Sequence, residues 1–202
     1  MKLDPFYPIF DSADWLARML PLGVRLVQLR VKDRTELETA REIARAKRLC
    51  AEAGCILVVN DYWHLAIEEG CDVVHLGQED LDDADLDAIR KAGMKLGVSS
   101  HDEAELERAL AAKPDYVALG PVYPTVLKAM TWGPQGLDRV TQWKRRLGDI
   151  PLVGIGGISL ERAPGVFAAG ADIVAAVTDI TLNADPEARL TAWLAATRET
   201  AA

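Results

Sequence analysis

Two clusters of acidic and amide side chains end two consecutive apolar runs of this sequence. Asn60 and Asp61 close the run CILVVN, and a triplet of Gln78, Glu79 and Asp80 follows the run DVVHLG. Acidic residues in loops usually only solvate a turn, so either cluster alone carries little information. Two carboxylates on neighbouring loops can instead share a hard cation, because Mg²⁺ takes one or two carboxylates together with substrate phosphate oxygens.

Basic side chains follow an earlier apolar run, VQLRVK. Alternation along a strand points Gln28, Arg30 and Lys32 to one side. The planar fork of Arg matches phosphate oxygens and Lys adds a compact charge, so the two cations together suit a polyphosphate. An ordinary pair of surface cations before a helix is the alternative interpretation.

The longest irregular stretch, GPVYPTVLKAMTWGPQG, carries three prolines and three glycines. Long loops in compact α/β proteins are often lids over an active site. Thr125 and Lys128 would then reach a phosphate and exclude water when the loop closes. A disordered surface loop is the alternative, but the apolar side chains of the stretch favour docking against the protein.

The elements that must position these side chains follow a regular alternation. Eight short apolar runs are each followed by a segment with helical spacing. The runs span residues 6–10, 24–30, 55–60, 72–77, 95–100, 115–120, 151–157 and 172–178. They are nearly continuous in apolar residues, which is typical of parallel strands covered on both sides. We therefore predict an α/β protein with a single (β/α)₈ TIM-barrel domain over residues 1–202; a doubly wound open sheet is the structural alternative.

In such a barrel the loops that follow the strands meet at one face, and that face holds the active site. Asp61 and Asp80 would then lie on adjacent loops and form a magnesium site. The loops after strands seven and eight frequently bind phosphate, because glycine lets the backbone approach an anion and free amides at a helix start bind it. We expect the amides of Gly157, Val177 and Thr178 to be the donors.

No nucleophile with its partners is apparent. Ser99 and Ser100 end the fifth run and His101 follows them, but sequence neighbours do not make a triad. Ser99 is a better candidate for a phosphate donor. His64 and His75 are more typical of structural histidines.

Composition excludes several classes of function. There are 23 basic and 31 acidic residues, a net charge of −8, which disfavours binding to nucleic acids or to anionic membranes. No stretch approaches the roughly 18 apolar residues of a membrane span, and charges interrupt the N-terminal segment where a signal peptide would be apolar. We therefore expect a cytoplasmic protein. Cys50, Cys55 and Cys71 form no Cys-x-x-Cys pair, so we expect free, buried thiols rather than a disulfide or zinc site.

Seven motifs in one order resemble the thiamine phosphate synthase family, also called thiamine-phosphate pyrophosphorylase. They are VQLRVK, VNDYWHLA, DVVHLGQEDL, LGVSSH, YVALGPVYPT with the following Lys128, PLVGIGGI, and the GAD before the eighth run. The resemblance covers the chain from about Tyr7 to the last helix. It implies a transferase of thiamine biosynthesis that joins hydroxymethylpyrimidine diphosphate to hydroxyethylthiazole phosphate and releases diphosphate.

The resemblance also implies roles for individual residues. Asp61 and Asp80 look like ligands of the Mg²⁺ cofactor, and Gln28 resembles the residue that faces the pyrimidine. The diphosphate contacts implied are Arg30, Lys32, Asn60, Ser99 and Lys128. Thr125 is implied near the thiazole or the diphosphate, and Gly157, Val177 and Thr178 resemble the cradle for the thiazole phosphate. The implied mechanism is dissociative: diphosphate leaves first, and the thiazole nitrogen captures a pyrimidine-stabilised carbocation.

One departure from the family pattern concerns the lid. The family commonly reads Pro-Thr-x-Thr-Lys, whereas this chain has the apolar residues Val126 and Leu127 between Thr125 and Lys128. This departure leaves open the turnover and the choice of thiazole. A related thiazole tautomerase and a non-catalytic barrel that binds thiamine precursors are the alternatives, although a tautomerase would not need the acids beside Arg30 and Lys32. Lid conformation and homo-oligomerisation are also left open.

Overall fold

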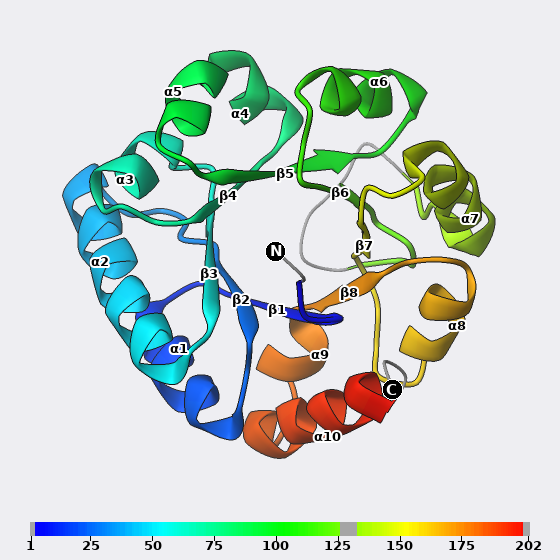
Figure 1. The fold of residues 1–202 in the computed structure, drawn as a ribbon. Coiled ribbons are helices and arrows are strands. Elements are labelled where there is room, and N and C mark those ends of the chain that lie inside the picture. Colours follow the sequence, from blue (N-terminus) through cyan, green and yellow to red (C-terminus); the bar gives the residue numbers. More distant parts are fainter. Residues whose placement is uncertain (1–2, 126–132, 200–202) are drawn as a thin grey trace.

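All eight apolar runs form parallel strands that close into a barrel in the order of the sequence (Figure 1). This computed structural model describes residues 3–125 and 133–199. The strands are β1 (Phe6–Phe10), β2 (Leu26–Leu29), β3 (Ile56–Asn60), β4 (Val73–Leu76), β5 (Lys95–Ser100), β6 (Tyr116–Leu119), β7 (Leu152–Gly154) and β8 (Ile173–Ala176). The predicted (β/α)₈ barrel is therefore confirmed, and the open sheet is excluded because β1 pairs with β8.

Helices surround the barrel as a ring (Figure 1). They are α1 (Ala13–Met19), the 3-10 helix η1 (Leu20–Leu22), α2 (Glu36–Ala53), α3 (Trp63–Glu68), α4 (Gln78–Asp83), α5 (Leu86–Lys91), α6 (Glu103–Ala111), α7 (Gly136–Leu147), α8 (Ala163–Ala168), α9 (Thr178–Thr181) and α10 (Pro186–Glu199). Helix α2 shows how local sequence sets these limits. Thr35 and Glu38 form a reciprocal capping box at its start, and Gly54 ends it in the left-handed conformation at φ 63°.

Two apolar layers follow from the alternation of side chains along the strands. One lies between the barrel and its helices and includes Phe6, Leu29 and Trp143. The other fills the barrel interior with residues such as Leu26 and Val153. Both layers exclude water, so the strands can read as continuous apolar runs. The three cysteines are free and buried, as expected.

The segment after β4 differs from the sequence-based expectation. We expected a loop around Gln78, Glu79 and Asp80, but these residues form the first turn of α4. Gly77 precedes them in an extended conformation, and the chain enters the helix directly from the strand. Asp80 therefore stands on a helix rather than on a loop. Similarly, Thr178, which we expected at the end of the eighth strand, begins the additional short helix α9.

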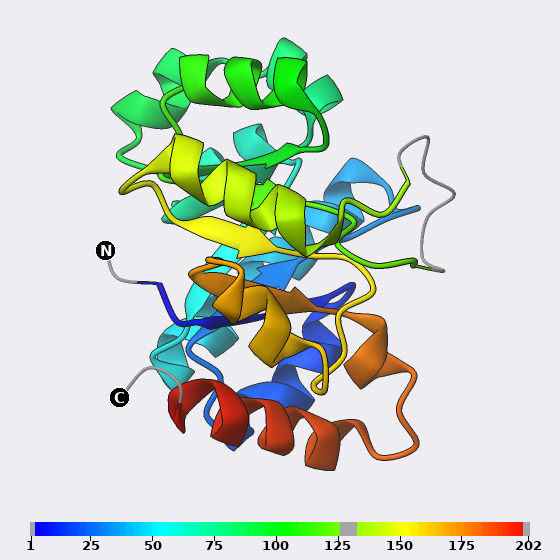
Figure 2. The same cartoon turned by 90° about the vertical axis from the view of Figure 1, so that its right-hand side faces the viewer.

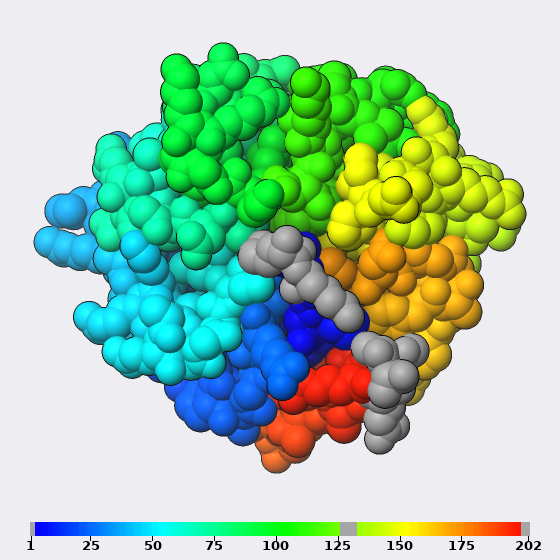
Figure 3. Space-filling view, viewed as in Figure 1, coloured from blue at the N-terminus to red at the C-terminus, as the bar shows by residue number. Residues whose placement is uncertain are grey.

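The two ends of the barrel are distinct. Strand β1 begins and α10 ends on one side, at the left of Figure 2, whereas α9 follows the C-terminal end of β8 on the opposite side. Viewed from the side where β1 begins, the N-terminal part of the chain is visible near the centre of the surface (dark blue in Figure 3), whereas the residues of β1 itself are buried. Within the described ranges, no helix is both long and apolar enough to cross a membrane.

Candidate active site

Most of the side chains predicted for the site follow the C-terminal ends of neighbouring strands. Arg30 and Lys32 follow β2, Asn60 ends β3 and Asp61 follows it, and Ser99 lies near the end of β5. Since parallel strands all end on the same face, these residues share one rim of the barrel. Thr125 is the last residue described before the gap in the lid. Lys128, Val126 and Leu127 lie outside the described residues.

Asp61 takes up an unusual backbone conformation at this rim. Its φ is 65°, in the left-handed region that Asp tolerates better than most residues. Its amide donates to the carbonyl oxygen of His75 on β4 at 2.9 Å, which anchors the turn. The carboxylate is mostly shielded, with 17% of the side chain exposed, and its Oδ2 accepts a hydrogen bond from Lys32 Nζ at 2.7 Å.

Asp80 on α4 lies beside Asp61, which follows the neighbouring strand β3. Partial burial raises the pKa of Asp80, and the charge of Asp61, within hydrogen-bonding reach, raises this pKa further. Lys32 and the amide of Gly77 oppose the rise. The Asp80 carboxylate folds back over Gly77, where an added Cβ would lie 2.9 Å from Oδ2. The two carboxylates therefore lie close together, and Lys32 does not fully compensate their negative charge.

The carboxylate pair fits a divalent cation. Within the described residues no group of three or more His, Cys, Asp or Glu side chains is placed to hold a metal ion. A pair of oxygen ligands is nevertheless the donor set that Mg²⁺ uses when substrate phosphate and water complete its coordination. The approach of Asp61 to Asp80 within hydrogen-bonding reach supports this fit, because a cation between the two carboxylates would relieve their repulsion.

Ser99 and His75 form a contact that the sequence analysis did not anticipate. His75 Nε2 lies 2.8 Å from Ser99 Oγ inside the barrel mouth. Burial lowers the pKa of His75 to about 4; the charge of Asp61 opposes this fall, and the charge of Arg30 adds to it. The imidazole is therefore neutral at neutral pH. It has one N–H donor and one acceptor nitrogen.

A chain of buried polar groups continues from His75 across the barrel interior. His75 Nδ1 lies 3.0 Å from the Tyr116 hydroxyl, which lies 3.0 Å from the Tyr7 hydroxyl. Tyr7 in turn accepts a hydrogen bond from Gln28 Nε2 at 2.8 Å. Burial raises the pKa of both tyrosines well above the usual 10, so both hydroxyls keep their protons.

Gly97 makes room for this chain. Strand pairing places Gly97 between His75 on β4 and Tyr116 on β6. A Cβ at Gly97 would collide with the Tyr116 ring. Without that side chain, Tyr116 crosses β5 and stacks on His75, with ring centroids 5.5 Å apart and an interplanar angle of 20°. The missing side chain on β5 thus brings residues of β4 and β6 together.

The turn after β7 supports the start of the segment that the sequence analysis predicts to be a lid. Gly156 and Gly157 have φ values of 92° and 64°. The carbonyl oxygens of Ile155 and Gly156 accept hydrogen bonds from Val122 at 2.8 Å and Tyr123 at 3.0 Å. A Cβ on Gly157 would collide with the carbonyl oxygen of Pro124 and lie 2.8 Å from that of Tyr123. Glycine therefore permits the close approach of two backbone segments here.

Free amides lie beside this turn. Within the described part of the chain, the amides of Gly157, Val177 and Thr178 donate no hydrogen bond to protein. Asp179 joins the two loops, because its Oδ2 accepts from the amide of Leu160 at 3.3 Å. Its carboxylate also accepts from Arg189 and Trp193, at 2.8 Å and 2.7 Å through Oδ2. Asp179 is a supporting residue that the motif reading missed.

The buried polar residues of the strands share one sequence signal, and three of them were missed. Tyr7, Gln28, His75 and Tyr116 all occupy inward positions of otherwise apolar strands. The interior of such a barrel is usually filled by branched apolar side chains, so a polar residue at an inward position is unusual. Gln28 was identified from a motif, but its buried partners depend on which positions meet across the closed barrel.

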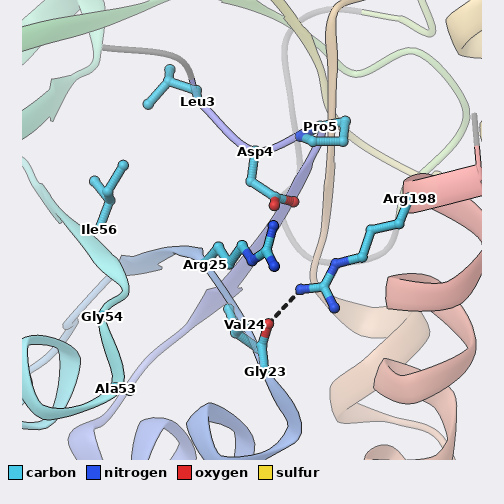
Figure 4. A pocket seen from close by; sticks show the side chains of 10 residues that line it. All are labelled: Leu3, Asp4, Pro5, Gly23, Val24, Arg25, Ala53, Gly54, Ile56 and Arg198. Atoms are coloured by element: carbon cyan, nitrogen blue, oxygen red, sulfur yellow. Dashed lines mark hydrogen bonds between the residues drawn. The ribbon is translucent and has the colours of Figure 1, made fainter. Parts of the chain in front are cut away.

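A cavity of about 710 Å³ lies at the opposite end of the barrel (Figure 4). It is lined by residues at the beginnings of β1, β2 and β3, together with Arg25 and Arg198. Arg198 Nη2 donates to the carbonyl oxygen of Gly23 at 2.5 Å, and this bond ties α10 to the turn before β2. The acids and cations of the candidate site lie on the other face, so this cavity is separate from it.

Comparison with known proteins gives a consistent result along the chain. A family model described as thiamine monophosphate synthase matches residues 7–180. A thiamine-phosphate synthase of Rhizobium etli is 66% identical over 197 residues, covering 98% of this chain and 97% of the relative. Another, of Cronobacter sakazakii, is 51% identical over 179 residues, covering 89% of this chain and 85% of that one.

Solved structures share the fold. The thiamine phosphate pyrophosphorylase of Pyrococcus furiosus superposes with a TM-score of 0.86 at 24% identity, covering 98% of this chain and 96% of that chain. A 3-hexulose-6-phosphate synthase superposes with a TM-score of 0.69 at 18% identity, covering 95% of this chain and 99% of that chain. At these identities the likeness bears on the barrel alone.

Proposed function

Because the chain belongs to the thiamine monophosphate synthase family, and is accordingly a transferase, we propose that it joins hydroxymethylpyrimidine diphosphate to hydroxyethylthiazole phosphate. The products are thiamine phosphate and diphosphate. The proposal includes the magnesium-assisted, dissociative substitution that the sequence motifs imply. A tautomerase would not need paired acids beside cations, so the carboxylate pair favours the synthase.

The contact between Asp61 and Asp80 beside Lys32 is the observation that carries the proposal. Two carboxylates with Lys32 at 2.7 Å from one of them support the proposal of a site for a metal-bound diphosphate. Mg²⁺ held by these acids would neutralise charge on the leaving diphosphate. Arg30 and Lys32 add fixed positive charge on the same rim, and Lys128 of the lid is proposed to do the same.

In this reaction the remaining residues would mainly position the substrates and exclude water. We propose that Ser99 and Asn60 hold the diphosphate and that Gln28 faces the pyrimidine. Stabilisation of the leaving group then comes from preorganised charges rather than from a general acid. Lid closure, with Thr125 near the thiazole or the diphosphate, would keep water from the carbocation before the thiazole nitrogen captures it.

The second substrate would bind at the glycine turn. The backbone amides of Gly157, Val177 and Thr178 have no acceptor among the described residues and are suited to a monophosphate, because each can donate directly to an oxygen of the anion. The start of the lid packs on the same turn through Tyr123 and Pro124. The thiazole phosphate would therefore lie under the lid, beside the pyrimidine site.

The test measures diphosphate release and thiamine phosphate formation in the same samples. Hydroxymethylpyrimidine diphosphate is supplied with and without hydroxyethylthiazole phosphate and with and without Mg²⁺. We expect equal amounts of both products, only when both substrates and Mg²⁺ are present. Asp61→Asn serves as the impaired variant, because Asn tolerates the left-handed backbone at this position. Its turnover should fall on the order of 100-fold while its melting temperature stays close to that of the parent.

The matched control is Asp14→Asn, which removes an exposed acid paired with Arg45 on α2. It should leave turnover unchanged. No thiamine phosphate from the parent protein, despite binding of both substrates, would overturn the synthase and leave a binding barrel or a tautomerase. Metal-independent formation of thiamine phosphate would keep the synthase but refute the magnesium site.

A further inference from the structure

Five side chains from five strands form one continuous hydrogen-bond chain through the barrel interior. The chain runs from Gln28 through Tyr7, Tyr116 and His75 to Ser99, with links of 2.8, 3.0, 3.0 and 2.8 Å. Burying these polar groups costs free energy unless every hydrogen bond is made, so the five side chains are coupled to one another. Its two ends, Gln28 and Ser99, are the residues proposed above to face the pyrimidine and the diphosphate.

The chain has two coherent arrangements of its protons. In the first, each group donates toward Ser99: Gln28 to Tyr7, Tyr7 to Tyr116, Tyr116 to His75 Nδ1, and His75 Nε2 to Ser99. The Ser99 proton is then free to bind an anion, and Gln28 Oε1 is free to accept from a substrate. In the second arrangement every link is reversed, so the Gln28 amide turns over and Ser99 donates inward to His75.

We propose that this chain is a directional relay, in which an anion at Ser99 orients the amide of Gln28 to accept a hydrogen bond from an amino group on the pyrimidine. The inference rests on the proposed function for the roles of Gln28 and Ser99. Tyr7, Tyr116 and His75 are positioning residues, because they act on the substrate only through the two ends of the chain.

The physical basis is that an anion cannot be bound by an oxygen that has no proton to offer. With a phosphate oxygen beside Ser99, the reversed arrangement places lone pairs against lone pairs, so the forward arrangement is favoured. The structure already has the forward orientation at the far end, where Gln28 Nε2 is on Tyr7. The hydroxyls of Tyr7 and Tyr116 are both buried and protonated, so neither loses the proton that the next hydrogen bond needs.

This relay predicts specificity that depends on the diphosphate. The proposed substrate carries an exocyclic amino group next to a ring nitrogen, and an oxo analogue exchanges that donor for an acceptor. Binding the oxo analogue requires the turned Gln28 amide and therefore the reversed chain. When the diphosphate is replaced by a plain hydroxymethyl group, the reversed chain costs little, and the two pyrimidines should bind more equally.

The experiment measures binding to the parent protein by calorimetry, with four probes and without thiazole phosphate. The probes are the amino and oxo pyrimidines, each as the diphosphate with Mg²⁺ and as the free alcohol. We expect the preference for the amino compound to be at least about tenfold larger among the diphosphates than among the alcohols. Tyr116→Phe and Tyr7→Phe should each make the two preferences equal. The double variant should do no more than either alone, because one break already interrupts the chain.

Ser100→Ala is the control for a loss of buried hydrogen bonding. Its Oγ accepts from Trp143 Nε1 at 2.9 Å and is buried on the outward face of β5. This variant should lose stability, as the Tyr variants do, but keep the diphosphate-dependent preference. Equal preferences in the parent protein, or an unchanged difference in both Tyr variants, would overturn the relay. Since no turnover is needed, a parent that binds as expected but forms no thiamine phosphate would refute the proposed reaction and leave the relay standing.

Discussion

The Lys32 ammonium group lies 2.7 Å from the carboxylate of Asp61, although the two residues follow different strands, β2 and β3. A cation bound to Asp61 would have to compete with this ion pair, so under the proposed function Lys32 would oppose metal binding until a diphosphate offered it another partner. Lys32 thereby couples the two halves of the proposed metal–diphosphate site.

Lys32→Gln should therefore bind Mg²⁺ more tightly in the absence of substrate and yet turn over more slowly. The gain is expected to be up to about fivefold in affinity, since a partly exposed ion pair contributes about 1 kcal/mol or less. Calorimetric titration with Mg²⁺ measures it. Lys95→Gln is the control, because it removes a comparable pair with Asp115 on the opposite face. A weaker or unchanged affinity in Lys32→Gln would show that Lys32 and the metal do not compete.

Asp80 should make the metal-free protein less stable as pH rises. Burial and the neighbouring Asp61 raise the pKa of this carboxyl in the folded state above its ordinary value of 3.8. Between these two pKa values the folded protein binds more protons than the unfolded chain, so the free energy of unfolding falls as pH increases through that window. Asp80→Asn should remove this part of the pH dependence.

Urea unfolding without metal, at several pH values between about 4 and 8, measures the effect as the difference between parent and variant. Glu79→Gln is the control, because Glu79 is exposed on the same first turn of α4. Added Mg²⁺ should stabilise the parent more at high pH than at low pH. A difference between parent and Asp80→Asn that does not vary with pH would contradict the raised pKa.

Gly157→Ala should disturb the lid and the proposed thiazole phosphate site together. Its Cβ would collide with the carbonyl oxygen of Pro124, so the start of the lid must move. We expect KM for the thiazole phosphate to rise by about tenfold or more, while affinity for the pyrimidine diphosphate changes less. Gly93→Ala is the matched control, because its φ of 73° carries a similar backbone strain with nothing within 4 Å. Equal kinetic effects of the two substitutions would refute a special role for this contact.

Gly97→Ala should destabilise the fold, because the Tyr116 ring occupies the space of the new methyl group. Overpacking of this kind costs about 1 to 3 kcal/mol, and urea unfolding measures the loss. Adding Tyr116→Leu should recover part of the stability, since the ring that causes the collision is gone. Gly133→Ala, where nothing lies within 4 Å, should be nearly neutral. A stable Gly97→Ala protein with Tyr116 still stacked on His75 would contradict this account.

Much of the rim follows from strand order. Because the runs are apolar, parallel and consecutive, Asp61 and the segment with Asp80 had to come from adjacent strands, and Lys32 from the strand before them. The local conformations did not follow in the same way. Asp80 stands on α4 because the chain enters a helix directly after Gly77. Gly77 has no side chain that could cap the helix, so the sequence does not indicate that a helix begins there.

The roles of His75, Tyr7 and Tyr116 were not accessible from sequence periodicity. Each is one polar residue in an apolar strand, and in isolation each resembles a satisfied core residue. Their meeting depends on barrel closure, which pairs β1 with β8, and on the missing side chain at Gly97. These are contacts between residues as far as 109 positions apart.

The sequence by itself determined the repeating units, the barrel and the face on which acids, cations and glycines gather, because these depend on local periodicity and on the order of the strands. Only the tertiary structure decided which buried groups touch, how close Asp61 comes to Asp80, and that one hydrogen-bond chain joins Gln28 to Ser99. Distances across a closed barrel depend on the sizes of all the side chains that fill its interior, and no local sequence pattern encodes how these side chains pack together.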